Sequence, residues 1–404
     1  MKNNAKTSAE LLAAQALVSQ VKKELTENIL PYWLNKMISD DGGFHGRIDG
    51  HEKHDTSAPV GNIMTARMLW TFASAYRLLG EQEYLDMANR AKDFIINHFY
   101  DSELGGTYWS LTPDGQPLDT KKQIYAIAFT IYGLAELNRA TGDGKALEYA
   151  IKLFNSIEDH SFDTEKDGYF EAFTRAWEPI EDMRLSEKDA NESKTMNTHL
   201  HVLEAYTCLF RVWKDKRLEE RLRGLICIFE KHIIAPDGHL KLFFDDDWNC
   251  GYDIISYGHD IEASWLLHEA ALVLGDPEVL ERIEKIVPEI AAAAGEGFGP
   301  DGSMIYEREG HDGPADKDLH WWVQAETVVG YFNLWEHFGS QEGIEKALMC
   351  WDFIKAHIID KENGEWFWSL RADGSINRDD DKAGFWKCPY HNGRMCMEII
   401  ERVR

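Results

Sequence analysis

Three histidines of this chain lie at the beginnings of apolar segments that have helical periodicity. Asn197 and His201 are four residues apart, and His259 and Glu262 are three residues apart. The members of each pair therefore share one face of a helix. His391 begins the last such segment, directly after the motif WKCPY. Because imidazole exists in both its acidic and its basic form near neutral pH, these positions predict proton transfer, with Glu262 orienting His259.

Cationic and aromatic residues accompany these histidines on other apolar segments. Arg67 lies within one such segment, and Tyr125 begins another. Trp322 and Glu326 are four residues apart on a third, and Trp386 precedes the last. An arginine suits a developing oxyanion, and the flat apolar face of tryptophan suits the C–H face of a sugar ring. The combination predicts proton abstraction beside a sugar carbonyl.

Two other kinds of site use the same residue types. Glu262 and Glu326 could be the two carboxylates of a glycoside hydrolase, which flank the scissile bond. His201, His259, Glu262 and His391 could together bind a metal ion, but the sequence has no His-Glu-x-x-His, paired-cysteine or EF-hand motif. We therefore expect neither a metal nor a cofactor. The hydrolase remains the alternative from a different reaction class, whereas a non-catalytic sugar-binding protein would not require paired histidines.

A glycine-containing turn followed by aromatic residues recurs along the chain and indicates the repeated elements that position these residues. The turn glycines are Gly43, Gly106, Gly168, Gly238, Gly302 and Gly364. In each unit the turn is followed by a short apolar or aromatic stretch, a long helical segment, a brief connection and a second helical segment. A nearly constant period of this length is typical of repeat architectures.

The two helical segments of each unit differ in their apolar pattern. Residues 123–142 are apolar on most sides, which indicates a buried helix, whereas residues 146–160 have a single apolar stripe, which indicates an outer layer. Six such units predict an all-α protein, an (α/α)6 barrel. A closed ring is favoured because the apolar last helix lacks the polar cap of an open solenoid. We expect one domain over residues 1–404, with residues 1–20 as an N-terminal extension.

The repeat also separates structural histidines from candidate site histidines. Four histidines recur six to eight residues before the turn glycines, at the ends of the outer helices, where they suit the last backbone carbonyls: His98, His160, His232 and His357. Five others lie in expected loops and have no functional signal: His45, His51, His54, His239 and His311. By contrast, His201, His259 and His391 lie at the beginnings of inner helices, which all start at the same end of a barrel.

Composition limits the partners of the protein. The formal charge of −27 argues against nucleic acid and anionic membranes, which require a basic surface. The N-terminal segment lacks the uninterrupted apolar core of a signal peptide, and no segment reaches the apolar length that spans a bilayer. The six cysteines are not closely paired, as expected for reduced thiols. We expect a cytoplasmic monomer.

Four stretches of the sequence resemble the N-acylglucosamine 2-epimerase superfamily, and within it the cellobiose 2-epimerases. They are TMNTHLHVLEAYT, SYGHDIEASWLL, WWVQAE and WKCPYHNGRMCMEII. The resemblance extends from about residue 20 to the C-terminus. It implies an (α/α)6 barrel that acts without a cofactor on β-1,4-linked disaccharides, inverting C2 of the reducing-end glucose. Cellobiose would become glucosyl-mannose, and lactose would become epilactose.

The resemblance also implies roles for individual residues. The catalytic histidines correspond to His259 and His391, and the further site residues correspond to Arg67, Tyr125, Asn197, His201, Trp248, Glu262, Trp322, Glu326 and Trp386. A neutral imidazole would remove the C2 proton, Arg67 would stabilise the cis-enediolate, and the opposite histidine would return a proton after rotation about C2–C3. Trp248, in the loop before the fourth inner helix, is expected to stack on the non-reducing sugar at the cavity mouth. The alternatives within the superfamily are N-acylglucosamine 2-epimerase and a mannose-type aldose–ketose isomerase, which returns the proton to C1.

Overall fold

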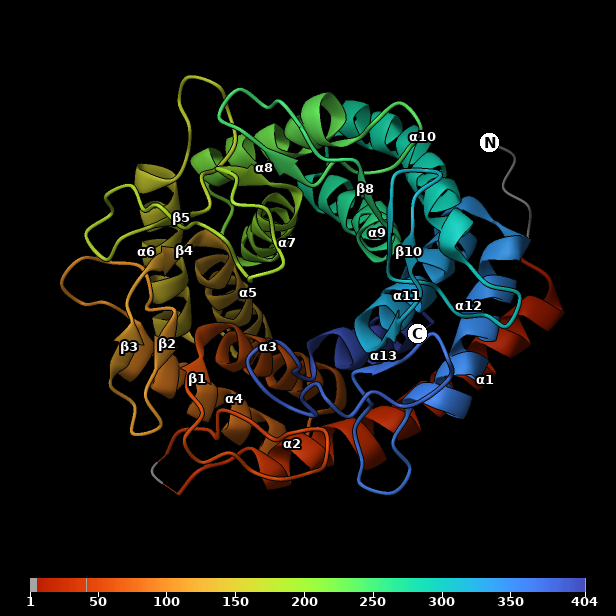
Figure 1. Cartoon of the computed structure of the whole chain (residues 1–404), viewed down its shortest axis with the longest axis horizontal. Coiled ribbons are helices and arrows are strands. Elements are labelled where there is room, and N and C mark those ends of the chain that lie inside the picture. The colour runs from red at the N-terminus through yellow and green to blue at the C-terminus, as the bar shows by residue number, and fades with distance from the viewer. Residues whose placement is uncertain (1–5, 41, 404) are drawn as a thin grey trace.

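The computed structural model describes residues 6–40 and 42–403 as two concentric rings of helices (Figure 1). Within these residues, the inner ring consists of α3 (Asn62–Leu79), α5 (Ile124–Thr141), α7 (Met196–Val212), α9 (Tyr257–Leu274), α11 (Trp321–Phe338) and α13 (Tyr390–Arg402). The outer ring consists of α1 (Ser8–Glu24), α2 (Leu30–Lys36), α4 (Gln82–Phe94), α6 (Gly144–His160), α8 (Lys216–Ile228), α10 (Pro277–Ala294) and α12 (Gln341–Phe353). Each inner helix packs against two inner neighbours, and α13 packs against α3. The prediction of an (α/α)6 barrel is confirmed.

Burial follows the apolar patterns of the sequence. In α5 every side chain from Ile124 to Leu137 is buried, because the helix has neighbours on all sides. In α6 the buried side chains include Ala150, Leu153 and Ile157, which form one stripe facing α5. Gly142 lies between the two helices with φ +76°, a left-handed conformation that ends α5 and lets the chain reverse direction.

The start of the chain supplies the outer helix of the last unit. Helix α1 lies beside α12 in the outer ring and packs against α13 (Figure 1). Its side chains of Ala14, Leu17 and Val21 are fully buried. Among the described residues no helix follows α13, and α1 takes the outer position against it. Residues 8–20, expected as part of an extension, therefore belong to the ring, because the outward face of α13 requires an apolar partner.

Short antiparallel strands connect neighbouring units at the end of the ring where the inner helices begin. The pairs form five small sheets: β1 (Val60–Gly61) with β2 (Ser110–Leu111) and β3 (Pro117–Asp119); β4 (Lys122–Gln123) with β5 (Ala172–Phe173); β6 (Lys194–Thr195) with β7 (Phe243–Phe244); β8 (Ile254–Ser256) with β9 (Glu307–Glu309) and β10 (Ala315–Asp316); and β11 (Leu319–His320) with β12 (Ser369–Leu370). Strands β1, β4, β6, β8 and β11 each lead directly into an inner helix. Their pairing with the following unit therefore holds the first turns of five inner helices at one end of the barrel.

No helix of the described residues combines the length and the apolar character needed to cross a membrane.

Candidate active site

The first turns of the inner helices surround a cavity of about 440 Å³. Nine of the eleven residues expected at the site line this cavity: Arg67, Tyr125, Asn197, His201, His259, Glu262, Trp322, Trp386 and His391. Glu326 lies behind the lining and is fully buried, and it contacts His391. Trp248 is not among the lining residues. The barrel thus gathers side chains from all six inner-helix starts, as the common end of those helices predicts.

One tryptophan contacts two of the histidines. The centre of the Trp322 ring lies 4.8 Å from that of His259 on α9 and 5.5 Å from that of His391 on α13. This approach depends on Gly258, because a Cβ atom there would lie 2.6 Å from Cη2 of Trp322. Two imidazoles from different helices therefore meet the same aromatic surface inside the cavity.

His391 is oriented by a buried carboxyl group on the neighbouring helix. Its Nδ1 lies 2.7 Å from Oε1 of Glu326, whose other oxygen accepts a hydrogen bond of 3.0 Å from Nε1 of Trp265. Nδ1–H donation to Glu326 leaves Nε2 of His391 as the basic nitrogen. Burial and the nearby charges of Arg67 and Arg394 hold the pKa of His391 well below its ordinary value. This histidine is therefore a neutral base at pH 7.

His259 is held by a serine hydroxyl rather than by a carboxylate. Its Nδ1 lies 2.8 Å from Oγ of Ser256, the residue that precedes α9. Burial and the nearby His201 lower the pKa of His259 to about 3, so it too is neutral at pH 7. Glu262, which we expected to orient this histidine, instead accepts a hydrogen bond of 2.6 Å from Nη2 of Arg394. A buried carboxyl group gains more from a buried guanidinium than from a histidine on its own helix.

Arg394 joins the carboxyl groups beneath the cavity into one network. Its Nη2 donates to Oε1 of Glu262 at 2.6 Å and to Oε1 of Glu326 at 2.7 Å, and its Nη1 donates to Glu204 and Tyr390. Burial and the neighbouring Glu326 raise the pKa of Glu262 above its ordinary value, and Arg394 opposes this shift. All five side chains are buried, so the arginine balances charge that would otherwise be unpaired.

Three members of this network, Arg394, Glu204 and Tyr390, were missed in the sequence, although a signal was present for the first two. Arg394 is three residues after His391, and Glu204 is three residues after His201, so each shares a helix face with a candidate histidine. Oε2 of Glu204 lies 2.9 Å from Nδ1 of His201. Burial opposes ionisation of Glu204, but Arg394 and His201 lower its pKa to about 2. Glu204 is therefore the ionised partner of both groups.

Arg67 is placed as a fixed cation on the cavity wall. Its Nη2 donates a hydrogen bond of 2.7 Å to Oη of Tyr125, and its guanidinium carbon lies 4.1 Å from the centre of the Phe129 ring. Its Nε is buried and has no hydrogen-bond partner among the described residues. Stacking and the tyrosine hydroxyl together restrict the guanidinium to one position facing the cavity.

Residues of the connections between units, together with Trp321 at the start of α11, complete the lining, and most of them have no signal in the sequence. They are Leu185, Ser186, Glu187, Lys188, Asp189, Tyr306, His320, Trp321, Trp368 and Asp380. Trp321 is adjacent to the expected Trp322 in the motif HWWVQAE. The others lie in connections between units, whose course the helical pattern does not predict.

The residues expected as metal ligands do not all lie together in the structure. Among the described residues, ligand atoms of Glu262, Glu326 and His391 lie within 4.8 Å of one another, but His201 and His259 do not belong to this group. The guanidinium of Arg394 bonds to both of these carboxyl groups. Its positive charge therefore occupies the position that a cation would take between them.

Trp248 has a structural environment away from the cavity. Its indole stacks on His232 with ring centres 4.5 Å apart, and its Nε1 donates a hydrogen bond of 2.9 Å to the carbonyl of Lys166. A Cβ atom on Gly168 would lie 2.4 Å from Cζ2 of Trp248. The expected position at the cavity mouth is therefore wrong, and the ring instead fastens a turn of the preceding unit.

The same arrangement recurs one unit earlier, which explains the error. Trp177 stacks on His160 with ring centres 4.2 Å apart, and its Nε1 donates to the carbonyl of Leu104 at 2.8 Å. A Cβ atom on Gly106 would lie 2.8 Å from this indole. Both tryptophans have positive φ angles, 63° for Trp177 and 65° for Trp248. A tryptophan in register with the repeat is thus structural, by the same argument that applies to the recurring histidines.

Known proteins resemble this chain over almost its whole length. Residues 42–393 match the family described as N-acylglucosamine 2-epimerase (GlcNAc 2-epimerase). A cellobiose 2-epimerase of Bacteroides fragilis is 62% identical over 388 residues, covering 96% of this chain and 99% of the relative. A cellobiose 2-epimerase of Ruminococcus albus is 41% identical over 389 residues with the same coverage. The solved structure of cellobiose 2-epimerase from Bacillus thermoamylovorans matches 96% of this chain and 100% of its own, with a TM-score of 0.91 and 40% identity. The chain belongs to the N-acylglucosamine 2-epimerase family.

Proposed function

We propose that this protein is a cellobiose 2-epimerase, an isomerase that inverts C2 of the reducing-end glucose in β-1,4-linked disaccharides. The single observation that carries the proposal is the pair of neutral histidines, His259 and His391, which line one cavity from two different helices. Inversion at a carbon requires proton removal on one face and proton return on the other, which two bases provide. The names of relatives 62% and 41% identical to this chain support the same activity.

The proposed reaction proceeds through an enediolate. After the sugar ring opens, the C1 aldehyde acidifies the C2 proton, and one histidine accepts that proton through its free Nε2. The negative charge that develops on O1 and O2 is stabilised by Arg67, whose position is fixed before the substrate binds. Rotation about C2–C3 then presents the other face of C2 to the second histidine. That histidine takes up a proton from solvent and gives it to C2, and the first histidine then releases the proton that it removed to solvent.

Polar atoms without partners in the cavity are assigned to sugar hydroxyls. Oδ1 of Asn197 and Oε2 of Glu262 are buried and lack hydrogen-bond partners among the described residues, and both side chains line the cavity. A buried polar atom of this kind is unfavourable unless a ligand or water bonds to it. The cavity volume of about 440 Å³ lies within the usual range for small-molecule sites, roughly 300–1,000 Å³.

Aromatic side chains are assigned to the two sugar rings. Trp322, in the first turn of α11, contacts both histidines, and Trp386, in the segment before α13, lines the same cavity and contacts Tyr125. We assign both to the reacting ring. Tyr306 and Trp368 come from the surrounding loops, and we assign them to the second sugar in place of Trp248. Stacking on the second ring would hold the reacting C2–H in position for proton transfer.

Replacement of Trp248 by alanine should affect stability, whereas replacement of Trp386 by alanine should affect activity. Trp248→Ala should lower the free energy of unfolding by about 3 kcal/mol, because it removes a buried indole, and should leave KM for cellobiose unchanged. Trp386→Ala should lower kcat/KM by about tenfold or more, because the reacting ring loses its positioning surface. Urea denaturation and steady-state kinetics on both variants check this, and a raised KM in folded Trp248→Ala would contradict our assignment of that residue.

The decisive test is the reaction in D2O. Purified protein incubated with cellobiose should produce glucosyl-mannose that contains deuterium at C2, because the returned proton comes from solvent. NMR of the product measures both the configuration and the label. A C2 epimer without label would contradict the two-base route.

The products formed from cellobiose, and from N-acylglucosamine incubated in the same way, distinguish the alternatives. A ketose product would indicate a mannose-type aldose–ketose isomerase, and release of glucose would indicate a glycoside hydrolase. Unchanged cellobiose together with epimerised N-acylglucosamine would indicate N-acylglucosamine 2-epimerase. Unchanged sugar in every case would indicate a binding protein.

The proposal also covers the domain organisation, location, oligomeric state and partners of the enzyme. We infer a single catalytic domain that functions as a cytoplasmic monomer, without a cofactor and without nucleic-acid or membrane partners. The formal charge of −27 supports the last point, because polyanionic partners would be repelled.

A further inference from the structure

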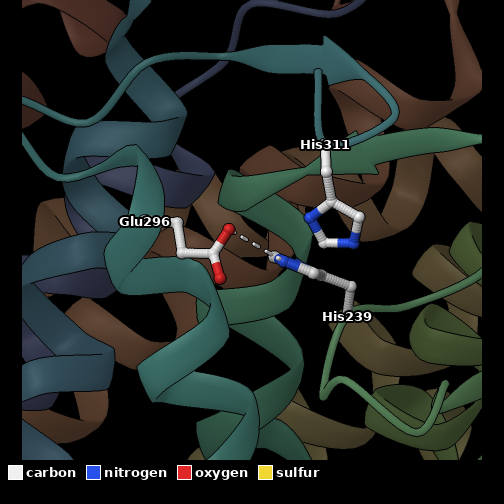
Figure 2. A group of neighbouring side chains, drawn as sticks. All are labelled: His239, Glu296 and His311. Atoms are coloured by element: carbon white, nitrogen blue, oxygen red, sulfur yellow. Dashed lines mark ion pairs between the residues drawn. The ribbon is translucent and has the colours of Figure 1, made fainter. Parts of the chain in front are cut away.

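Outside the cavity, three side chains from separate segments of the chain converge on one another (Figure 2). His239 follows the turn glycine Gly238, Glu296 belongs to the short 3-10 helix Gly295–Gly297, and His311 lies in the hairpin between β9 and β10. One ligand atom from each of the three residues lies within 4.8 Å of the others. None of the three lines the cavity described above.

His239 has the contacts that are typical of a metal ligand. Its side chain is buried, and its Nδ1 lies 2.7 Å from Oδ2 of Asp260 on the first turn of α9. Its Nε2 is buried without a hydrogen-bond partner among the described residues and points toward Oε2 of Glu296, 3.5 Å away (Figure 2). Histidines that bind metals characteristically donate their other ring N–H to a carboxylate. Here the carboxylate of Asp260 is in place, and the second nitrogen makes no hydrogen bond among the described residues.

His311 has a carboxylate partner of the same kind. Its Nε2 lies 3.2 Å from Oδ2 of Asp237, and its ring centre lies 5.6 Å from that of His239. Three carboxylates, those of Asp237, Asp260 and Glu296, therefore surround two imidazoles. This excess of negative charge around the buried His239 favours a bound cation.

We propose that His239, Glu296 and His311 bind one divalent transition-metal ion, with Asp260 orienting His239 and Asp237 orienting His311. Two imidazoles and one carboxylate suit Zn²⁺, Co²⁺ or Ni²⁺, and water completes the coordination. The spacing of the ligand atoms is wider than in a filled site. Rotation of Glu296 and of the His311–Asp237 pair closes it, because these three side chains are 54%, 55% and 47% exposed, whereas Asp260 holds the buried His239 in place.

The bound ion would stabilise the fold and would take no part in catalysis. It fastens the β9–β10 hairpin, which carries His311, to the turn of His239 and to the end of α10. The ligands are outside the cavity, so chelation should leave turnover intact. The proposal is therefore independent of the proposed epimerisation.

Calorimetric titration of the full chain with ZnCl2 tests the site. The Cys227→Ser background removes an exposed thiol that would also bind zinc. We expect one ion per chain, and His311→Ala and Glu296→Gln should each weaken binding by about tenfold or more. His51→Ala, which changes an exposed loop histidine elsewhere, should bind as tightly as the parent.

A second measurement keeps the test decisive. Zinc should raise the melting temperature of the parent protein, since a ligand that binds only the folded state stabilises it, and should not raise that of His311→Ala. Equal zinc affinity in the parent, His311→Ala and Glu296→Gln would overturn the site, as would absence of binding to the parent. Turnover that is lost on EDTA treatment and restored by zinc would contradict the separation between this ion and catalysis.

Discussion

Replacement of His391 by asparagine is expected to lower the turnover of cellobiose by about 10²–10⁴ while the barrel remains folded. Asparagine fills much of the same space but cannot accept the C2 proton. The histidine lines a cavity, so its loss leaves no packing defect in the core. His259→Asn should lose activity to a similar extent, because each histidine serves one face of C2. Steady-state kinetics and circular dichroism of both variants measure the two quantities.

His98→Asn is the matched control for this experiment. His98 lies in the π-helical segment Ile95–Phe99 that continues the outer helix α4, and its Nδ1 is 3.1 Å from the carbonyl of Gly115, away from the residues that line the cavity. Turnover should therefore remain close to that of the parent, with a modest loss of stability. Our division of the histidines would be wrong if folded His98→Asn were as inactive as His391→Asn.

Arg394→Met is expected to cause the largest loss of stability, about 3–5 kcal/mol in the free energy of unfolding at pH 7. The arginine is fully buried and bonds to Glu204, Glu262 and Glu326, so its removal leaves three buried carboxyl groups without their cation. Methionine preserves most of the volume, so the loss reports charge rather than packing. Urea denaturation followed by circular dichroism measures it.

The pH dependence of this variant has a definite sign. Without the arginine, burial raises the pKa values of these carboxyl groups in the folded state, so folding favours their protonated forms. The deficit of Arg394→Met should therefore narrow as the pH falls from 7 to about 5. Arg282→Met provides the control, because Arg282 pairs with Glu230 while 45% exposed, and such pairs contribute less than about 1 kcal/mol. Equal stability of the two variants would contradict the role assigned to Arg394.

Contacts between elements account for the site assignments that the sequence did not predict. Helical spacing places Glu262 on the same face as His259, yet its carboxyl group bonds to Arg394 on α13. The carboxyl group that orients His391 is Glu326, from α11. Spacing within a helix identifies which side chains share a face, but the partner of a buried charge is decided by the helix packed opposite. Trp248 differs from these cases, because its equivalence to Trp177 is visible in the repeat.

The amino-acid sequence alone determined the architecture and the end of the barrel at which the site lies. A period of about 64 residues and the contrast between all-round and one-sided apolar helices require an inner and an outer ring, and inner helices that begin at one end must bring His201, His259 and His391 together. The tertiary structure decided the non-local contacts. These are the closure of the ring by α1 against α13, the network around Arg394, and the meeting of His239 with His311. Local pattern cannot report such contacts, because each joins residues that are far apart in the chain and becomes favourable only after packing removes both partners from water.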